Sequence, residues 1–140
     1  MYFNTKYFKL KTVEDHARFS FTHVTKHWKK STSKGGTRNV LLRYYPPLIK
    51  DFSKRHKDEN AVYEQVENIS NPLRCPVKLY EFYMSKCPEC VKVRNDIFYL
   101  YPERSCVPDS PVWYSTQPLG QEIIAKMIQR IKIVREINEN

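Results

Sequence analysis

The residues of this chain that could bind a metal ion are its four cysteines. Cys87 and Cys90 are separated by two residues, the spacing of a zinc knuckle, and Cys75 and Cys106 are two further thiols. A second knuckle is missing, and Cys75 stands next to a proline at an expected helix start. Thiols of an intracellular chain are normally kept reduced. We therefore predict four reduced cysteines, no metal site and no other cofactor.

Three other short patterns are weaker indications of a binding site. His23 and His27 are four residues apart, but no third ligand is near them in sequence, so we interpret them as polar surface residues. Gly35 and Gly36 lack the lysine and serine of a phosphate-binding loop, so nucleotide binding is not indicated. Residues 71–74 are explained equally well as a turn before a helix. None of these patterns predicts a small-molecule substrate.

The positive charge of the chain is concentrated in one segment. Residues 26–57 contain ten basic residues and a single acid, Asp51, and so carry the whole net charge of +9. One interpretation is a surface for a nucleic-acid backbone, and the alternative is a solvated hairpin and loop that keep the chain soluble. The candidate nucleic-acid-binding residues are Lys26, Lys29, Lys30, Lys34, Arg38, Arg43, Lys54 and Arg55.

In the first half of the chain the pattern predicts one helix and three strands. Thr12, followed by two acids, is typical of a helix start. Residues 23–28 and 40–45 are rich in β-branched and aromatic side chains, with a glycine-containing turn at 33–36, and so predict a hairpin. Residues 49–60 are polar and predict a loop. In residues 62–69 apolar and polar side chains alternate imperfectly, which predicts a third strand.

The second half predicts two helices with irregular chain between them. Pro76 suits the first turn of a helix, and Pro88 should stop it. Residues 98–101 predict a short apolar strand or extended segment, and the prolines that follow predict an irregular stretch. Apolar residues then recur at helical spacing from Ile124 to Val134. The whole chain predicts a small antiparallel sheet flanked by these two helices.

Composition limits the chain to one modest domain. With 140 residues, 41% of them hydrophobic, it can bury a single core. Aromatic residues make up 14%, so packed rings should fill that core. No apolar run reaches the roughly 20 residues of a membrane helix, and no signal-peptide core is present. We therefore expect an intracellular protein without a membrane partner.

Three stretches resemble a known family. Residues 71–88 read NPLRCPVKLYEFYMSKCP, residues 98–100 read FYL, and residues 110–118 read SPVWYSTQP. They resemble the recombinase-derived C-terminal domain of MYM-type zinc-finger proteins and a glutamine-rich relative, a domain associated with Crypton-type mobile elements. The resemblance covers essentially the whole chain. It implies an α/β (α+β) fold, a truncated tyrosine-recombinase-like catalytic domain, in which residues 1–140 are a fragment or short isoform lacking the N-terminal and catalytic C-terminal parts.

The resemblance also implies that DNA cleavage is lost. In tyrosine recombinases two arginines bind the oxygens of a phosphodiester while a tyrosine attacks its phosphorus. The first arginine of the resembled family falls in a segment like residues 8–16, where this chain has Lys11. A lysine cannot reproduce the forked contact of arginine. A His-x-x-Arg motif is absent from the sequence, so we expect no catalytic residues and no enzyme.

Two functions remain open at this point. The resemblance implies a protein-interaction domain of a nuclear transcription or chromatin regulator. The alternative is a residual, sequence-independent DNA-binding domain that uses the basic residues of 26–57. Nuclear transcription or chromatin proteins are the expected partners in the first case, and the DNA backbone in the second.

Overall fold

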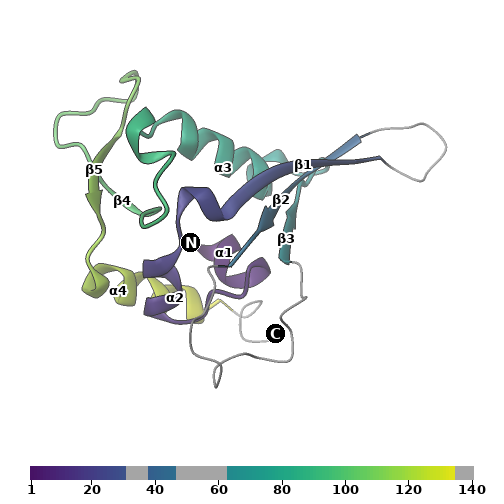
Figure 1. Ribbon diagram of the computed structural model, residues 1–140, viewed down its shortest axis with the longest axis horizontal. Coiled ribbons are helices and arrows are strands. Elements are labelled where there is room, and N and C mark those ends of the chain that lie inside the picture. The colour runs from purple at the N-terminus through teal and green to yellow at the C-terminus, as the bar shows by residue number, and fades with distance from the viewer. Residues whose placement is uncertain (31–37, 47–62, 135–140) are drawn as a thin grey trace.

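The computed structural model describes residues 1–30, 38–46 and 63–134 (Figure 1). The expected turn at 33–36 and the whole of the expected loop at 49–60 lie outside these residues. In chain order the elements are α1 (Tyr2–Tyr7), α2 (Val13–Arg18), η1 (Phe21–His23), β1 (Val24–Lys30), β2 (Arg38–Tyr44), β3 (Tyr63–Val66), η3 (Pro72–Arg74), α3 (Pro76–Ser85), η4 (Glu89–Val91), β4 (Leu100–Pro102), β5 (Tyr114–Pro118) and α4 (Gln121–Lys132). Helices and small antiparallel sheets make the mixed α+β fold that the sequence predicts. None of the helices in the described part of the chain is long and apolar enough to cross a membrane.

The main sheet has the order β1-β2-β3 and is antiparallel throughout. Val24 pairs with Tyr44 in the hairpin, and Tyr44 pairs in turn with Tyr63 of β3. The predicted hairpin and third strand are therefore confirmed, although β3 covers only four residues. Figure 1 shows the far end of the β1–β2 pair projecting away from the helices.

The start of α2 follows the predicted capping chemistry. The backbone N–H of Asp15 donates to Thr12 Oγ1 at 3.0 Å, and the Asp15 carboxylate accepts the Thr12 N–H at 3.2 Å. This reciprocal pair satisfies two donors that a helix start leaves open. Lys9, just before it, has a φ of 61°, a left-handed conformation that turns the chain between α1 and α2.

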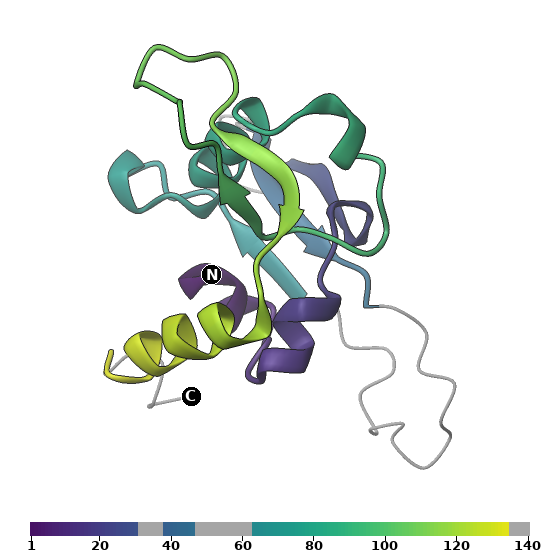
Figure 2. The ribbon, with the colours of Figure 1, turned by 90° about the vertical axis from the view of Figure 1, so that its left-hand side faces the viewer.

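The two predicted long helices are present, but only one of them covers the sheet. α3 begins at Pro76 as expected and ends at Ser85, before Pro88 is reached. α4 buries Ile124 and Ile128, as its apolar spacing predicts. It packs mainly against α2 rather than against the sheet, which corrects the expected arrangement of two flanking helices (Figure 2).

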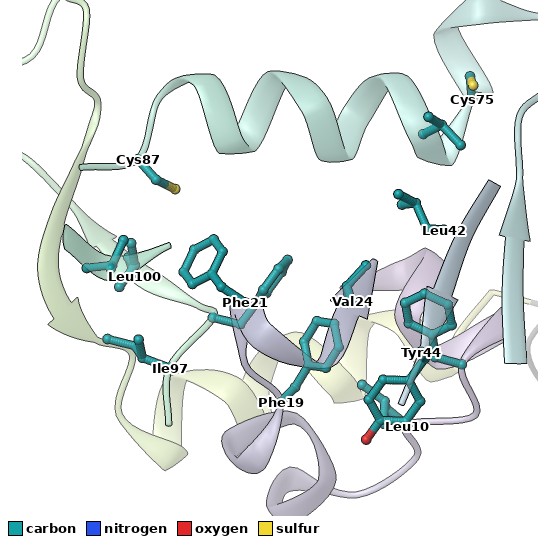
Figure 3. Close-up of a cluster of buried hydrophobic side chains, with 14 residues drawn as sticks. Leu10, Phe19, Phe21, Val24, Leu42, Tyr44, Cys75, Cys87, Ile97 and Leu100 are labelled. Atoms are coloured by element: carbon teal, nitrogen blue, oxygen red, sulfur yellow. The ribbon is translucent and has the colours of Figure 1, made fainter. Parts of the chain in front are cut away.

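The core is built largely from aromatic rings, as the composition predicts (Figure 3). Phe19 is 1% exposed, and its ring lies 4.4 Å from that of Phe98 between centroids. The same ring lies 5.5 Å from Tyr44 and 6.1 Å from Phe8. Phe19 therefore joins the start of the chain, the sheet and the segment before β4.

A chain of hydrogen bonds between polar side chains runs beside this core. Gln65 Nε2 donates to Asn4 Oδ1 at 2.7 Å, and Asn4 Nδ2 donates to the Tyr99 hydroxyl at 2.8 Å. Tyr99 then contacts His16 Nδ1 at 2.8 Å, and His16 Nε2 contacts Thr5 Oγ1 at 3.0 Å. Since Tyr99 accepts from Asn4, its own proton is available to a neutral His16, which in turn donates through Nε2. His16 is only 1% exposed, and burial lowers its pKa to about 4.

A second, two-stranded sheet consists of β4, which overlaps the short strand expected at 98–101, and β5, which lies in the stretch for which an irregular chain was expected. Leu100 pairs with Pro118, and a register shift follows before Pro102 pairs with Tyr114. The backbone N–H of Trp113 donates to the Lys86 carbonyl at 2.9 Å, which fastens this sheet to the end of α3. The prolines shorten the strands here without preventing them.

Candidate interaction surfaces

The described basic residues of β1 lie on opposite faces of the sheet. Lys26 pairs with Leu42, a core residue, and its ammonium forms an ion pair with Glu81 of α3. It also lies 5.4 Å from the centroid of the Trp28 ring. Lys29 is three residues further along, so its side chain points to the other face. The two lysines therefore do not line one continuous surface.

Lys29 and Arg43 share a single carboxylate. Lys29 Nζ lies 2.9 Å from one oxygen of Glu64, and Arg43 Nη2 lies 2.8 Å from the other. The hydrogen bond from Lys29, with a further one from Arg43, holds the pKa of Glu64 below its usual range. Glu64 lies outside the basic segment in sequence but beside it in space. It offsets part of the charge that the sequence assigns to this surface.

Of the other candidate nucleic-acid-binding residues, the described structure places two on neighbouring strands. Lys30 ends β1 and Arg38 begins β2, where the two residues are paired through the backbone. Lys34, Lys54 and Arg55 fall outside the described residues. The proposed role of all eight in nucleic-acid binding stays a prediction.

Lys11, at the position expected for a catalytic arginine, is an exposed residue at the entry to α2. Its backbone N–H donates to the Asp15 carboxylate at 3.2 Å, and Leu10 before it is buried. The local structure therefore anchors the backbone here and leaves the ammonium group in solvent.

The cysteines and histidines are not arranged as a metal site in the described part of the chain. Cys87 lies in the core, where burial raises the pKa of its thiol to about 11, whereas Cys90 is exposed. Cys75 accepts the backbone N–H of Asn68 at 3.2 Å. His23, expected at the surface, is half-buried, and burial lowers its pKa.

A partly exposed aromatic cluster joins the outer side of α3 to the segment before β5. The Phe82 ring is edge-on to Trp113, with 5.2 Å between centroids. Lys86 Nζ lies 4.7 Å from the centre of the Trp113 ring and donates to the Ser110 carbonyl at 2.9 Å. Phe82 is 49% exposed and Val112 is 38% exposed, whereas Lys86 and Trp113 are half-buried. We call Phe82, Lys86, Val112 and Trp113 the aromatic surface.

A family profile described as "Domain of unknown function (DUF3504)" matches residues 1–133. The chain belongs to this family. The DUF3504 chain is 48% identical over 147 residues to human Zinc finger MYM-type protein 3, covering 99% of the chain and 11% of that protein. It is 46% identical over 139 residues to human Transcriptional regulator QRICH1, covering 99% of the chain and 18% of that protein. Mouse Zinc finger MYM-type protein 2 is 44% identical over 144 residues, with 97% and 10% covered.

The expected kinship of this DUF3504 chain with MYM-type zinc-finger proteins is thus confirmed. The chain spans between about a tenth and a fifth of the length of these relatives. No solved structure is significantly similar to it.

Sequence reasoning missed the aromatic surface of the DUF3504 chain, although its residues lie inside the stretches that carry the resemblance. By helical spacing Phe82 lies off the predicted apolar side of α3, and Trp113 lies in a proline-rich stretch. The available signal was the placement of Phe82 between Lys78 and Lys86, which is unusual for a residue facing the core.

Proposed function

We propose that this DUF3504 chain is a catalytically inactive, recombinase-derived domain through which a nuclear transcription or chromatin regulator binds other proteins. The name of one relative, Transcriptional regulator QRICH1, supports a regulatory role. Three relatives are much longer than the region they share with this chain, as expected for a domain that works within a larger regulator.

The observation that carries the interaction role is the aromatic surface. Binding energy at protein interfaces is concentrated in a few residues, among which tryptophan and arginine are enriched and aromatic rings are common. Phe82 and Trp113 present two rings in fixed edge-on contact, and Lys86 holds the segment before β5 against α3. A preorganised apolar surface of this kind loses little side-chain entropy when a partner binds.

Replacing Phe82 with alanine should remove partner binding without unfolding the domain. We expect transcription or chromatin proteins captured from nuclear extract by the wild-type chain to be lost with Phe82→Ala. Quantitative mass spectrometry of the captured proteins is the measurement. Leu73→Ala is the matched control, because Leu73 is 97% exposed and lies before the other end of α3. Equal capture by wild type and Phe82→Ala, with both folded by circular dichroism, would exclude this surface.

Catalytic inactivity makes a separate prediction. An exposed lysine at position 11 offers one point charge where bidentate contact to phosphate oxygens is needed. Incubation with a nicked suicide DNA substrate should therefore trap no covalent protein–DNA product on a denaturing gel. A phosphotyrosyl peptide of this chain in the digest would show that the domain still cleaves DNA.

A second candidate function, weak binding to the DNA backbone, is favoured by the net charge of +9. Non-specific complexes of this kind have dissociation constants of about 10⁻⁴ to 10⁻⁶ M at physiological salt. We expect Lys29→Ala to shallow the log–log salt dependence by about one unit. Alanine is used because a carboxylate at this position would face Glu64. Fluorescence anisotropy with a random duplex at several salt concentrations measures the slope.

The control for this experiment is Lys78→Ala, which removes an exposed lysine of α3 outside the basic segment. It should leave the salt slope close to that of the wild type. If the wild-type chain shows no salt-sensitive binding, the basic residues serve solubility and the DNA candidate is wrong.

A further inference from the structure

An apolar cavity of about 350 Å³ lies between α1, the main sheet and α3. Its wall includes Phe19, Val24, Leu42 and Leu100, whose side chains are labelled in Figure 3. Leu79 also lines the cavity and is 54% exposed, which places it at the entrance. The cavity is therefore a hollow in the core that a molecule can reach from solvent.

The size of the cavity indicates the size of its ligand. An engineered cavity of about 150 Å³ with an aliphatic and aromatic lining binds benzene. Small-molecule sites in proteins usually fall between about 300 and 1,000 Å³. A cavity of about 350 Å³ is thus at the small end of this range and matches a two-ring molecule.

The chemistry of the wall indicates that the ligand is uncharged. None of the lining side chains in the described structure carries a charge. Met1 also lines the cavity, and burial lowers the pKa of its α-amino group to about 6, so this group is mostly neutral above that pH. An ion would lose its hydration there without a compensating partner. The rings of Tyr83 and Phe98, with centroids 5.2 Å apart, offer aromatic edges and faces instead. Two amides, those of Asn4 and Gln65, belong to the polar part of the wall, together with tyrosine hydroxyls.

We propose that this cavity is a binding site for an uncharged two-ring aromatic or alicyclic molecule. A single hydroxyl or carbonyl on that molecule would lie against the amides of Asn4 and Gln65. Phe82, Lys86 and Trp113 do not line the cavity, so this site is separate from the aromatic surface. Its test is independent of the proposed protein-binding function.

Titration of the labelled chain with 2-naphthol, followed by ¹H–¹⁵N NMR, tests the proposal. We expect saturable shifts in residues around the cavity and a dissociation constant of about 10⁻⁴ to 10⁻³ M, as suits a small apolar ligand. Naphthalene-2-sulfonate is the matched charged probe, and its binding should be at least about tenfold weaker because its charge would be desolvated.

Two variants locate the site. Val24→Phe should fill part of the cavity, and Leu79→Trp should narrow its entrance, each weakening 2-naphthol binding about tenfold or more. Leu79 is half-exposed, so Leu79→Trp should fold even if Val24→Phe does not. Leu73→Trp makes the same change at an exposed leucine outside the cavity and should bind like the wild type.

Three results would overturn the proposal. The first is a titration of the wild-type chain in which 2-naphthol causes no saturable shift. The second is equal binding of the sulfonate, which would contradict an uncharged ligand. The third is an equal loss of binding in Leu73→Trp and Leu79→Trp, which would place the probe elsewhere on the surface.

Discussion

Replacing Phe19 with alanine should destabilise the fold by about 3–5 kcal/mol, because the loss of a buried ring removes its transfer energy and leaves a cavity. Phe19 is 1% exposed and contacts rings from three separate parts of the chain. Domains of this size are commonly stable by only about 5–15 kcal/mol. The expected loss is thus large compared with the total free energy of unfolding, and urea unfolding followed by tryptophan fluorescence would measure it.

Phe82→Ala is the control for this prediction, since it removes the same side chain from a half-exposed position. Its free energy of unfolding should fall by clearly less than that of Phe19→Ala. Equal losses in the two variants would mean that Phe19 does not hold the core together as its contacts indicate.

Lowering the pH should reduce the free energy of unfolding, because His16 is buried in its neutral form. Its pKa is about 4 in the folded chain and about 6.5 in the unfolded chain, so the unfolded chain binds the proton more readily between these values. The contribution of the neutral histidine is fully present above pH 6.5 and is lost as the pH falls towards 4. The difference corresponds to about 3 kcal/mol, which urea unfolding at a series of pH values would detect.

The variant that isolates this effect is His16→Gln, which removes the titrating group but keeps a polar side chain. The free energy of unfolding of His16→Gln should depend much less on pH between 6.5 and 4, whatever its absolute value. His23 should contribute a smaller change of the same sign, because burial also lowers its pKa. His27→Gln is the control, since this residue bonds Thr25 near the surface. If the free energy of unfolding of His16→Gln depends on pH as steeply as that of the wild type, His16 does not cause the pH dependence.

Local features of the fold were predictable because their causes are local in sequence. The cap at Thr12 depends on an acid three residues later, and the start of α3 depends on Pro76. The pairing of β1 with β2 follows from two apolar runs close together in the chain. The strand at β4 was partly expected, but β5 and its pairing with β4 were missed because prolines obscure a strand of five residues.

The electrostatic character of the basic segment was not predictable in the same way. Glu64 and Glu81 are distant in sequence from the lysines that they meet, and only the packing of β3 and α3 brings them together. Charge counted along a chain therefore overestimates the field at a folded surface. The aromatic surface and the cavity were missed for a related reason, because both are formed by segments that meet only in the fold.

The position of β1 at the edge of the main sheet gives its lysines a further consequence. A seven-residue edge strand has unpaired backbone N–H and C=O groups, which can pair with a strand of another molecule. The exposed ring of Trp28 adds an apolar contact for such pairing. Proteins commonly block such growth with edge lysines, since stacking two copies would bring like charges together. Lys26 and Lys29 flank Trp28 and would act as gatekeepers against aggregation. Neutralising both should make the chain prone to form β-rich assemblies, whether or not it ever meets DNA.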